Sequence, residues 1–308
     1  FGSVATSQFL FGIVGGGIAL FAMSQLHYRH LRRYAFYIFL LTVLLTLAVF
    51  ILGLGMTHGG ATRWISIGGF TLQPAELLKL GFIIYVATWL SGMRDVITDT
   101  VKGTLPFVAI VGSVGFVMLL QPDTDTFLIM GAAAMAMFVT AGGRWRDVGL
   151  MFVSAVLLLA IVAMVRPYIM DRLTTFLHPE RDPLGSGYQI QQSLIAVGSG
   201  GFSGRGFGQS IQKFEYLPEP IGDSIFAVYA EEFGFVGSSL LILLYLGFTF
   251  RGYKIAGQAP DLFGTLLVVG FMTLIICQAF LNIGAMLGVA PLSGLPLPFI
   301  SHGGTALL

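Results

Sequence analysis

Carboxylates gather in one stretch of a chain that is otherwise poor in charge. Glu215, Glu219 and Asp223 fall within nine residues, although charged residues make up only 10% of the 308 residues. A carboxylate can act as a general base toward a hydroxyl group within hydrogen-bond reach. Asp223 also directly precedes an apolar helical run that begins at Ser224, so it could instead cap that helix. The pattern leaves catalysis and capping open, and one residue can do both.

Other charged residues occur where membrane helices are expected. Glu231 and Glu232 lie inside an apolar run, where acids are costly and therefore suggest a function. Glu76 and Lys79 are three residues apart, which places them on one helical face where they can pair. This pair either pins its helix to a neighbour, or Lys79 binds an anionic head group together with Arg63, since both side chains are phosphate ligands.

Two loops have more than one interpretation. The stretch from Gly198 to Gly208 is rich in glycine and could hold a phosphate with its N–H groups and Arg205. It follows no predicted strand, so it is not a nucleotide-binding fingerprint, and a plain loop is the alternative. Asp123 and Asp125 follow Gln121-Pro122 and are expected to cap the next helix.

The composition indicates a polytopic membrane protein. Mean hydropathy is +0.86, hydrophobic residues make up 56% of the chain, and there are 41 glycines. The net charge of +1 comes without a basic patch, which argues against a nucleic-acid partner. The single cysteine, Cys277, excludes an internal disulfide and a cysteine-rich metal site.

Apolar runs of the length needed to span a bilayer, about 20 residues as a helix, recur along the chain. Eight are predicted, and a ninth begins near Phe299: they lie near 8–25, 34–54, 74–91, 104–120, 126–141, 147–165, 224–250 and 262–287. Arginine and lysine gather in alternate connections, which predicts that these connections are cytoplasmic: Arg29, Arg32 and Arg33; Arg94 and Lys102; Arg144 and Arg146; Arg251 and Lys254.

The other connections should face outward, and two of them carry structure of interest. The 166–223 segment is too long to be only a connection, and within it Ser186–Val197 is predicted to form a short interfacial helix with Ile190, Leu194 and Val197 on one face. The stretch from Asn282 to Gly304 contains three prolines at membrane depth. Such broken backbone must be buried or line a polar cavity, and we expect a cavity near the outer leaflet.

Several motifs, in order, resemble the SEDS family (shape, elongation, division and sporulation), which includes FtsW and RodA. They are Gly60 to Trp64, Gln73-Pro-Ala-Glu-Leu-Leu-Lys79, Gln121-Pro-Asp123, Asp182-Pro-Leu-Gly-Ser-Gly-Tyr-Gln189, Tyr216-Leu-Pro-Glu219, Asp223 to Gly234 and Pro291 to Gly304. The resemblance implies an all-α polytopic membrane protein of about ten helices. Residues 1–308 would be one domain with about nine of these helices and an extracytoplasmic loop at 166–223. The chain shows no cleavable signal peptide, and we expect it to be part of a longer protein that has a further first helix and a complete last one.

The resemblance also implies an activity: peptidoglycan glycosyltransfer from lipid II, an undecaprenyl-diphosphate-linked disaccharide, outside the cytoplasmic (inner) membrane of a bacterium. Asp223 matches the family's essential acid, Glu215 matches another important acid, and Glu76 with Lys79 matches a charged pair. Glu219 belongs to the same acidic stretch. Three departures affect details of the site: Ile221-Gly222 replaces His-Thr, Thr124-Asp125 replaces Leu-Gly, and His302 replaces an aromatic residue.

Chemistry and partners follow from that implied activity. Asp223 would deprotonate the acceptor 4-hydroxyl, and Arg63, Lys79, Arg205 or a divalent cation such as Mg or Mn would stabilise the leaving pyrophosphate. Implied partners are lipid II, membrane lipids, a class B penicillin-binding protein and other divisome or elongasome proteins. The sequence from Gln212 to Glu219 resembles the division branch of the family, FtsW, more than RodA. Alternatives are an elongation polymerase like RodA, a lipid II flippase, and a scaffold for a transpeptidase.

Overall fold

The computed structural model describes residues 8–51, 55–58, 61–67, 70–182 and 185–302. Residue contacts divide these into two compact units. Unit 1 contains the described residues up to Met151 together with Thr249–Ile275, and unit 2 contains Phe152–Phe248 and Ile276–His302. Three long helices, α7, α11 and α12, contain residues of both units.

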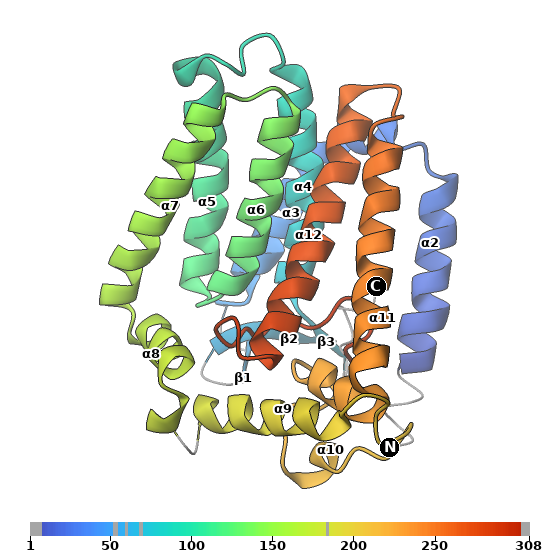
Figure 1. Cartoon of the computed structure of the whole chain (residues 1–308). Helices are drawn as coiled ribbons and strands as arrows, with labels where there is room; N and C mark the ends of the chain where they lie inside the picture. The colour runs from blue at the N-terminus through green and yellow to red at the C-terminus, as the bar shows by residue number, and fades with distance from the viewer. Residues whose placement is uncertain (1–7, 52–54, 59–60, 68–69, 183–184, 303–308) are drawn as a thin grey trace. The chain divides into compact units, whose positions relative to one another are not determined.

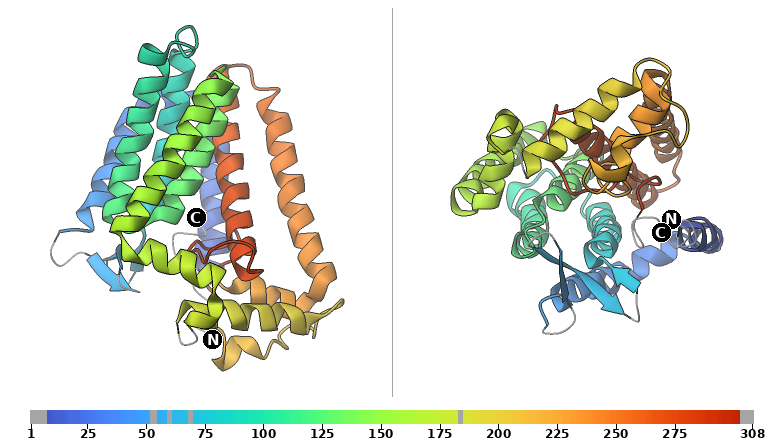
Figure 2. Two further views of the ribbon diagram at one scale, coloured as in Figure 1. Left: turned by 60° about the vertical axis from the view of Figure 1, so that its left-hand side comes forward. Right: turned by 90° about the horizontal axis from the view of Figure 1, so that it is seen from below.

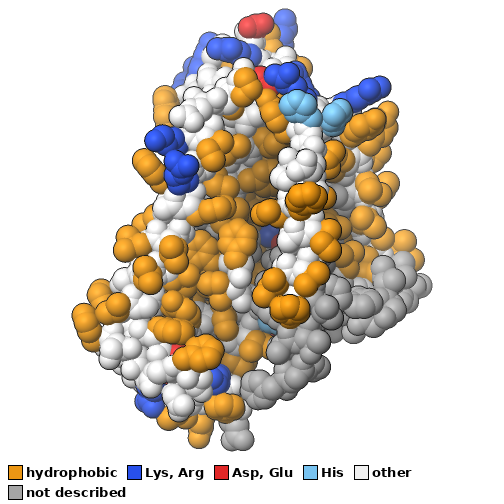
Figure 3. All heavy atoms as spheres, turned by 90° about the vertical axis from the view of Figure 1, so that its right-hand side faces the viewer, with side chains coloured by type: hydrophobic (Ala, Val, Ile, Leu, Met, Phe, Trp, Pro, Cys, Tyr) orange, Lys and Arg blue, Asp and Glu red, His pale blue; other side chains and the backbone are white. Residues whose placement is uncertain are grey.

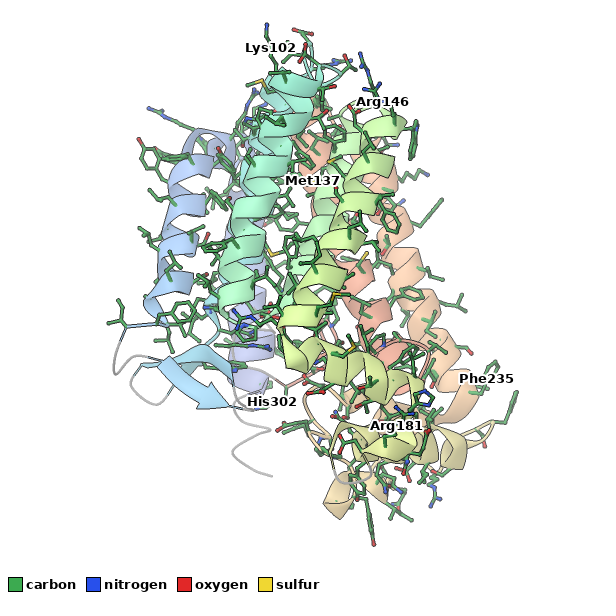
Figure 4. The ribbon with its side chains drawn as sticks, turned by 90° about the vertical axis from the view of Figure 1, so that its left-hand side faces the viewer. Lys102, Met137, Arg146, Arg181, Phe235 and His302 are labelled. Carbon is green, nitrogen blue, oxygen red and sulfur yellow. The ribbon has the colours of Figure 1, made fainter. Side chains whose placement is uncertain are left out.

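Unit 1 is a bundle of apolar helices. Its core lies between helices α3, α4, α5 and α6, where Leu78, Phe82, Phe107 and Phe138 are fully buried. Met137 points into the same bundle (Figure 4). The helical elements that begin within this unit are η1 (Gln8–Gly15), α2 (Gly16–Gln25), α3 (Arg29–Ala48), α4 (Pro74–Gly92), η2 (Thr100–Thr104), α5 (Leu105–Leu120), α6 (Thr124–Thr140), α7 (Trp145–Val165) and α12 (Leu262–Met286) (Figure 1).

A small antiparallel sheet connects α3 to α4. Its strands are β1 (Gly55–His58), β2 (Ala61–Ile67) and β3 (Phe70–Leu72), with β2 in the middle. Trp64 pairs with Met56, and Ile65 pairs with both Gly55 and Leu72. The sequence analysis did not predict this sheet. Its strands are shorter than the apolar runs beside them, although β2 contains residue types that favour strands, namely Thr62, Trp64, Ile65 and Ile67.

Unit 2 contains the long segment that was predicted to face outward, and most of that segment is helical. Its elements are α8 (Pro167–Leu177), η3 (Pro179–Arg181), α9 (Ser186–Gly200), α10 (Gln212–Glu215) and α11 (Ile225–Ala256) (Figure 2). The helix predicted at Ser186–Val197 is present as α9, which runs across the end of α11, and its position at the membrane surface stays a prediction. Its buried face is rotated from the predicted one: Ile190, Ser193 and Ala196 are buried, while Leu194 is 44% exposed.

The membrane helices agree with the sequence prediction. Six described helices are long and apolar enough to cross a membrane, and two shorter apolar helices, Gly12–Gln25 and Thr124–Thr140, accompany them. Together they correspond to the eight predicted runs. The ninth run falls almost entirely outside the described residues. The all-α class is confirmed, with the three-stranded sheet as an addition.

Charge is sorted along unit 1 as the positive-inside rule predicts. Lys102 and Arg146 lie at one end (Figure 4). The guanidinium of Arg29 pairs there with Asp261 at 3.1 Å, which joins the α2–α3 and α11–α12 connections. A polar cavity of about 510 Å³, lined partly by Arg94, lies at the same end. On the face shown in Figure 3, hydrophobic side chains cover the helices, and basic side chains gather mostly at one end.

Candidate functional site

Asp223 lies in a turn whose backbone is fixed on both sides. Its own carbonyl accepts a hydrogen bond from Asn282 Nδ2 at 2.7 Å, and the carbonyl of Gly222 accepts one from Ser301 Oγ at 2.7 Å. The N–H of His302 donates to the carbonyl of Ile221 at 2.8 Å. Asp223 itself is half-buried. The backbone that carries this acid is therefore fixed by contacts on both sides.

The contacts around Asp223 also orient its carboxylate. A Cβ atom added at Gly294 would lie 3.6 Å from Asp223 Oδ2, so the carboxylate faces the backbone of the proline-rich segment. Helix α11 begins at Ile225, and Ser224 stands directly before it. Ser224 is buried, donates through Oγ to the Pro218 carbonyl at 2.8 Å, and accepts from Gln189 Nε2 at 3.0 Å.

Glu219 begins this turn in a strained conformation. Its φ is +47°, in the left-handed region that side chains other than glycine rarely adopt. The Glu219 carbonyl accepts from the N–H groups of Gly222 at 3.1 Å and Ser224 at 3.2 Å. Its carboxylate lies over Gly222, where an added Cβ would be 3.5 Å from Glu219 Oε2. Glu219 and Asp223 thus belong to one compact turn. The side chain of Glu215, at the end of α10, lies outside the described part of the structure.

The proline-rich segment packs against side chains of unit 2. Gln278 Nε2 donates to the Pro296 carbonyl and Asn282 Nδ2 to the Leu295 carbonyl, each at 2.8 Å. The Tyr245 hydroxyl donates to the carbonyl of Pro298. Buried carbonyls that no helix satisfies must find such donors, which explains how the broken backbone is stable at membrane depth. The outer-leaflet cavity inferred from this segment stays a prediction.

Glu231 and Glu232 form a buried network that fixes the middle of the long segment. Glu231 is fully buried and accepts from Ser210 Oγ at 2.6 Å and from the N–H groups of Ile211 at 3.2 Å and Gln212 at 3.3 Å. Glu232 pairs with Lys213 Nζ at 2.6 Å. Both acids therefore hold residues about 20 positions earlier in the chain against α11.

Arg205 belongs to this network. Its Nε lies 3.4 Å from Glu231 Oε1, and its N–H donates to the Glu231 carbonyl at 3.0 Å. The N–H of Gly206 donates to the Glu232 carbonyl at 3.0 Å. A phosphate cradle in the glycine-rich loop would have to use other donors, and the role of Arg205 toward a substrate stays a prediction.

A second polar cluster lies in unit 1, where the sheet meets the turn between α5 and α6. Arg63, on β2, donates from Nε to the Gln121 carbonyl at 3.2 Å and from Nη2 to the Pro122 carbonyl. Its Nη1 is 4.0 Å from Asp123 Oδ1. Asp123 caps α6 as predicted, because Oδ1 accepts the Thr126 N–H. Arg63 thus stabilises a helix start beside a polar surface.

This cluster contains buried polar atoms that lack hydrogen-bond partners among the residues described. They are Gln121 Oε1, Asp123 Oδ2 and Thr126 Oγ1, on side chains that are at most 3% exposed. Buried polar atoms are nearly always satisfied, so a polar ligand or solvent would find acceptors here.

Glu76 and Lys79 pair as predicted in the first turns of α4. Lys79 Nζ lies 2.7 Å from Glu76 Oε2, and the two side chains are 4% and 13% exposed. Burial of a charged pair is tolerated because each charge compensates the other. Arg63, Glu76 and Lys79 belong to unit 1, whereas Asp223, Glu219 and Arg205 belong to unit 2.

The residues described hold no group of three or more His, Cys, Asp or Glu side chains placed to bind a metal ion. A role for a divalent cation stays a prediction. The Glu231–Ser210 and Asp223–Asn282 contacts were missed by sequence reasoning, because each joins residues far apart in the chain. Their only sequence signal was the cost of an acid or amide at membrane depth.

The apolar helices and the polar turns at their ends define a multi-pass helical membrane protein. The chain belongs to the FtsW, RodA and SpoVE family, that is, the SEDS family: the family model, described as "Cell cycle protein", matches residues 2–308. This confirms the family that the motifs predicted.

Relatives of known name cover most of the chain. Stage V sporulation protein E of Bacillus subtilis (strain 168) is 40% identical over 305 residues, which are 98% of this chain and 82% of that protein. A probable peptidoglycan glycosyltransferase FtsW of Idiomarina loihiensis is 41% identical over 272 residues, which are 87% of this chain and 66% of that protein.

Solved structures share the fold. A chain from a study described as "Structural coordination of polymerization and crosslinking by a peptidoglycan synthase complex" has a TM-score of 0.81 and 29% identity, and the match covers 99% of this chain and 85% of that one. The rod shape determining protein RodA of Thermus thermophilus has a TM-score of 0.66 and 25% identity over 98% of this chain and 81% of its own.

Proposed function

We propose that the protein is a peptidoglycan glycosyltransferase that polymerises lipid II at the outer face of the bacterial inner membrane, for septal wall synthesis. The observation that carries the proposal is the setting of Asp223: a half-buried carboxylate whose flanking backbone is fixed by Asn282 and Ser301. Relatives named peptidoglycan glycosyltransferase FtsW support the same activity.

In this proposal Asp223 is the general base. It accepts the proton of the acceptor sugar's 4-hydroxyl while that oxygen attacks the anomeric carbon of the donor. The new bond joins this oxygen to the anomeric carbon, and the bond from that carbon to the pyrophosphate oxygen breaks. Fixing the backbone around Asp223 fits this role, because a base must be held within hydrogen-bond reach of the hydroxyl. Glu219 and Glu215 would position the turn.

The leaving pyrophosphate needs positive charge as it departs. Arg63, Lys79 and Arg205 are the candidates, and each already contacts a protein acceptor: the Gln121 carbonyl, Glu76 and Glu231. Glu76 would hold Lys79 in place.

The test is polymerisation of fluorescent lipid II by the protein in its full length, with and without a class B penicillin-binding protein as partner. The native protein should form glycan strands, and Asp223→Asn should form none at unchanged thermal stability. The matched control is Glu180→Gln, because Glu180 is an acid of the same segment that is 67% exposed and pairs with the exposed side chain of His178. Strand synthesis by Asp223→Asn would remove Asp223 as the base.

The elongation role is a second candidate, supported by the likeness to RodA. The two roles are separated by depleting the native gene, expressing the protein again, and scoring septa and rod shape. A division enzyme should restore septa only. A partner transpeptidase is proposed in either case, from the peptidoglycan synthase complex that shares the fold.

A lipid II flippase is a third candidate, supported by the buried Glu76–Lys79 pair in a membrane helix. Lipid transport across liposomes without strand formation would favour it. If the protein is instead only a scaffold for a transpeptidase, cells that carry Asp223→Asn should grow normally.

A further inference from the structure

Exposed aromatic side chains gather where the glycine-rich loop meets α11. Phe202 and Phe207 are 73% and 82% exposed. The Phe202 ring stacks on Phe235 and the Phe207 ring contacts Phe233, each with ring centroids 6.1 Å apart. We call these four residues the aromatic cluster. Phe235 projects outward from α11 beside the loop (Figure 4).

The loop is held firmly against a break in α11. Gly234 has φ +64° and ψ −162°, which interrupts the helix. The N–H of Phe235 donates to the Gly201 carbonyl at 2.9 Å, and the N–H of Val236 donates to the Phe202 carbonyl at 3.1 Å. Before the break, the N–H groups of Arg205 and Gly206 donate to the carbonyls of Glu231 and Glu232. Because backbone bonds thus join the loop to both sides of the break, Phe202 is kept beside Phe235.

The length of the apolar part of α11 places Phe202 and Phe235 at the boundary of the membrane. From Phe235 to Phe250 the sequence of α11 is free of ionisable acids and bases other than tyrosine, and Arg251 follows. These roughly 16 residues span about 24 Å as a helix. The hydrocarbon core is about 30 Å thick, so the whole stretch is needed to cross it, and Phe235 cannot stand far outside.

The outer surface of α11 supports the same placement. Beyond the break, Phe235, Leu240, Leu243 and Leu244 are 56% to 65% exposed, as expected of a lipid-facing helix. The stacking of Phe202 on Phe235 makes the loop continuous with that surface. Aromatic rings are favoured at the level of lipid head groups.

We propose that the aromatic cluster inserts into the head-group region of the lipid bilayer, so that the glycine-rich loop anchors the long segment of unit 2 to the membrane surface. The partner is the lipid surface itself. The inference rests on α11 as a membrane helix and is independent of the glycosyltransferase proposal.

The chain has a single cysteine, so one substitution gives a cysteine-free background for site-specific labelling. Cys277→Ser provides a background into which Phe202→Cys, Phe207→Cys or Phe214→Cys is introduced, and each thiol is labelled with nitrobenzoxadiazole. The labelled full-length proteins are placed in nanodiscs of phosphatidylcholine and phosphatidylglycerol. Phe214 is the matched control, because it is 60% exposed and lies on α10, at the end of unit 2 away from the α11 span (Figure 1).

Emission should shift to the blue in the order Phe202→Cys, then Phe207→Cys, then Phe214→Cys. Lipids with a nitroxide high on the acyl chain should quench the first two labels and leave the third bright, whereas aqueous iodide should quench the third. Labels at 202 and 207 that emit like the one at 214 and are quenched by iodide would overturn the proposal. Because Phe207 is 82% exposed, Phe207→Cys should fold normally and decides the question alone if Phe202→Cys does not fold.

Discussion

Two pairs of acids flank the start of α11, and the structure treats them in opposite ways. Glu231 and Glu232 are buried, and their carboxylates are occupied by Ser210, Lys213 and backbone N–H groups. Asp223 is half-buried and Glu219 is exposed, and hydrogen bonds to the backbone fix the turn that contains them. In the first pair the side chain holds the fold. In the second pair the surrounding backbone positions the side chain, and catalysis requires a group that is positioned in this way.

The largest expected difference is in stability. Glu231→Ala removes the acceptor of two backbone N–H groups and of Ser210 Oγ, and leaves the Ser210 hydroxyl buried without it. We expect a loss of about 3 kcal/mol in the free energy of unfolding. Asp223→Asn should change it by less than about 0.5 kcal/mol, as is usual away from buried networks. Thermal unfolding of the purified proteins in nanodiscs measures both.

These two variants also separate stability from activity. Asp223→Asn should lose strand synthesis while it keeps its melting temperature, and Glu231→Ala should lower the melting temperature first. If the two variants are equally destabilised, Asp223 is a structural acid and the contrast between the pairs disappears.

A smaller effect is expected from two glycines of the same segment. An alanine Cβ at Gly204 would lie 2.1 Å from the Glu232 carbonyl oxygen, and Gly204 has φ +82°. At Gly222 the nearest contact is 3.5 Å, and no positive φ is required there. Gly204→Ala should therefore destabilise the protein by more than about 1 kcal/mol. Gly222→Ala should have little effect on melting temperature, so equal shifts would contradict the rigid attachment of the loop.

The membrane helices could be predicted because each is one continuous apolar run. The shorter elements between these runs could not be predicted in the same way. The strands around Trp64 and the amphipathic helix α8 are short segments between long helices, and hydropathy gives them little weight. The resemblance of its motif to the family identified Asp223 as the candidate catalytic acid. The pairing of Glu76 with Lys79 followed from their helical spacing.

The partners of the other acids could not be predicted. Glu231 meets Ser210, and Asp223 meets Asn282, across 21 and 59 residues of sequence. Contacts of that separation depend on how the chain folds back on itself, for which a periodic pattern gives no signal. This is why Glu231 suggested a function from the sequence, whereas the structure places it in a buried hydrogen-bond network.

The smallest effect concerns Asp261, an acid of unit 1 whose carboxylate is occupied like that of Glu231 but at a more exposed position. The N–H of Gly264 donates to it at 2.7 Å, and Tyr28 and Arg29 contact it at 3.0 and 3.1 Å. The Gly264 N–H, followed by these two side chains, lowers the pKa of Asp261 below its ordinary value, against the opposing effect of partial burial. Folding therefore favours the charged form.

The sign of the pH effect follows from that shift. Below about pH 4 the unfolded carboxyl binds a proton more readily than the folded one. The stability contributed by Asp261 is thus complete above its unfolded pKa and is lost as pH falls through the folded pKa. Asp261→Asn should remove this part of the acid destabilisation and cost about 0.5 kcal/mol at neutral pH, since Arg29 is exposed and asparagine can still cap α12. Melting temperatures of both proteins between pH 3 and pH 7 test this. Parallel profiles would show that Asp261 makes no charge-dependent contribution to stability.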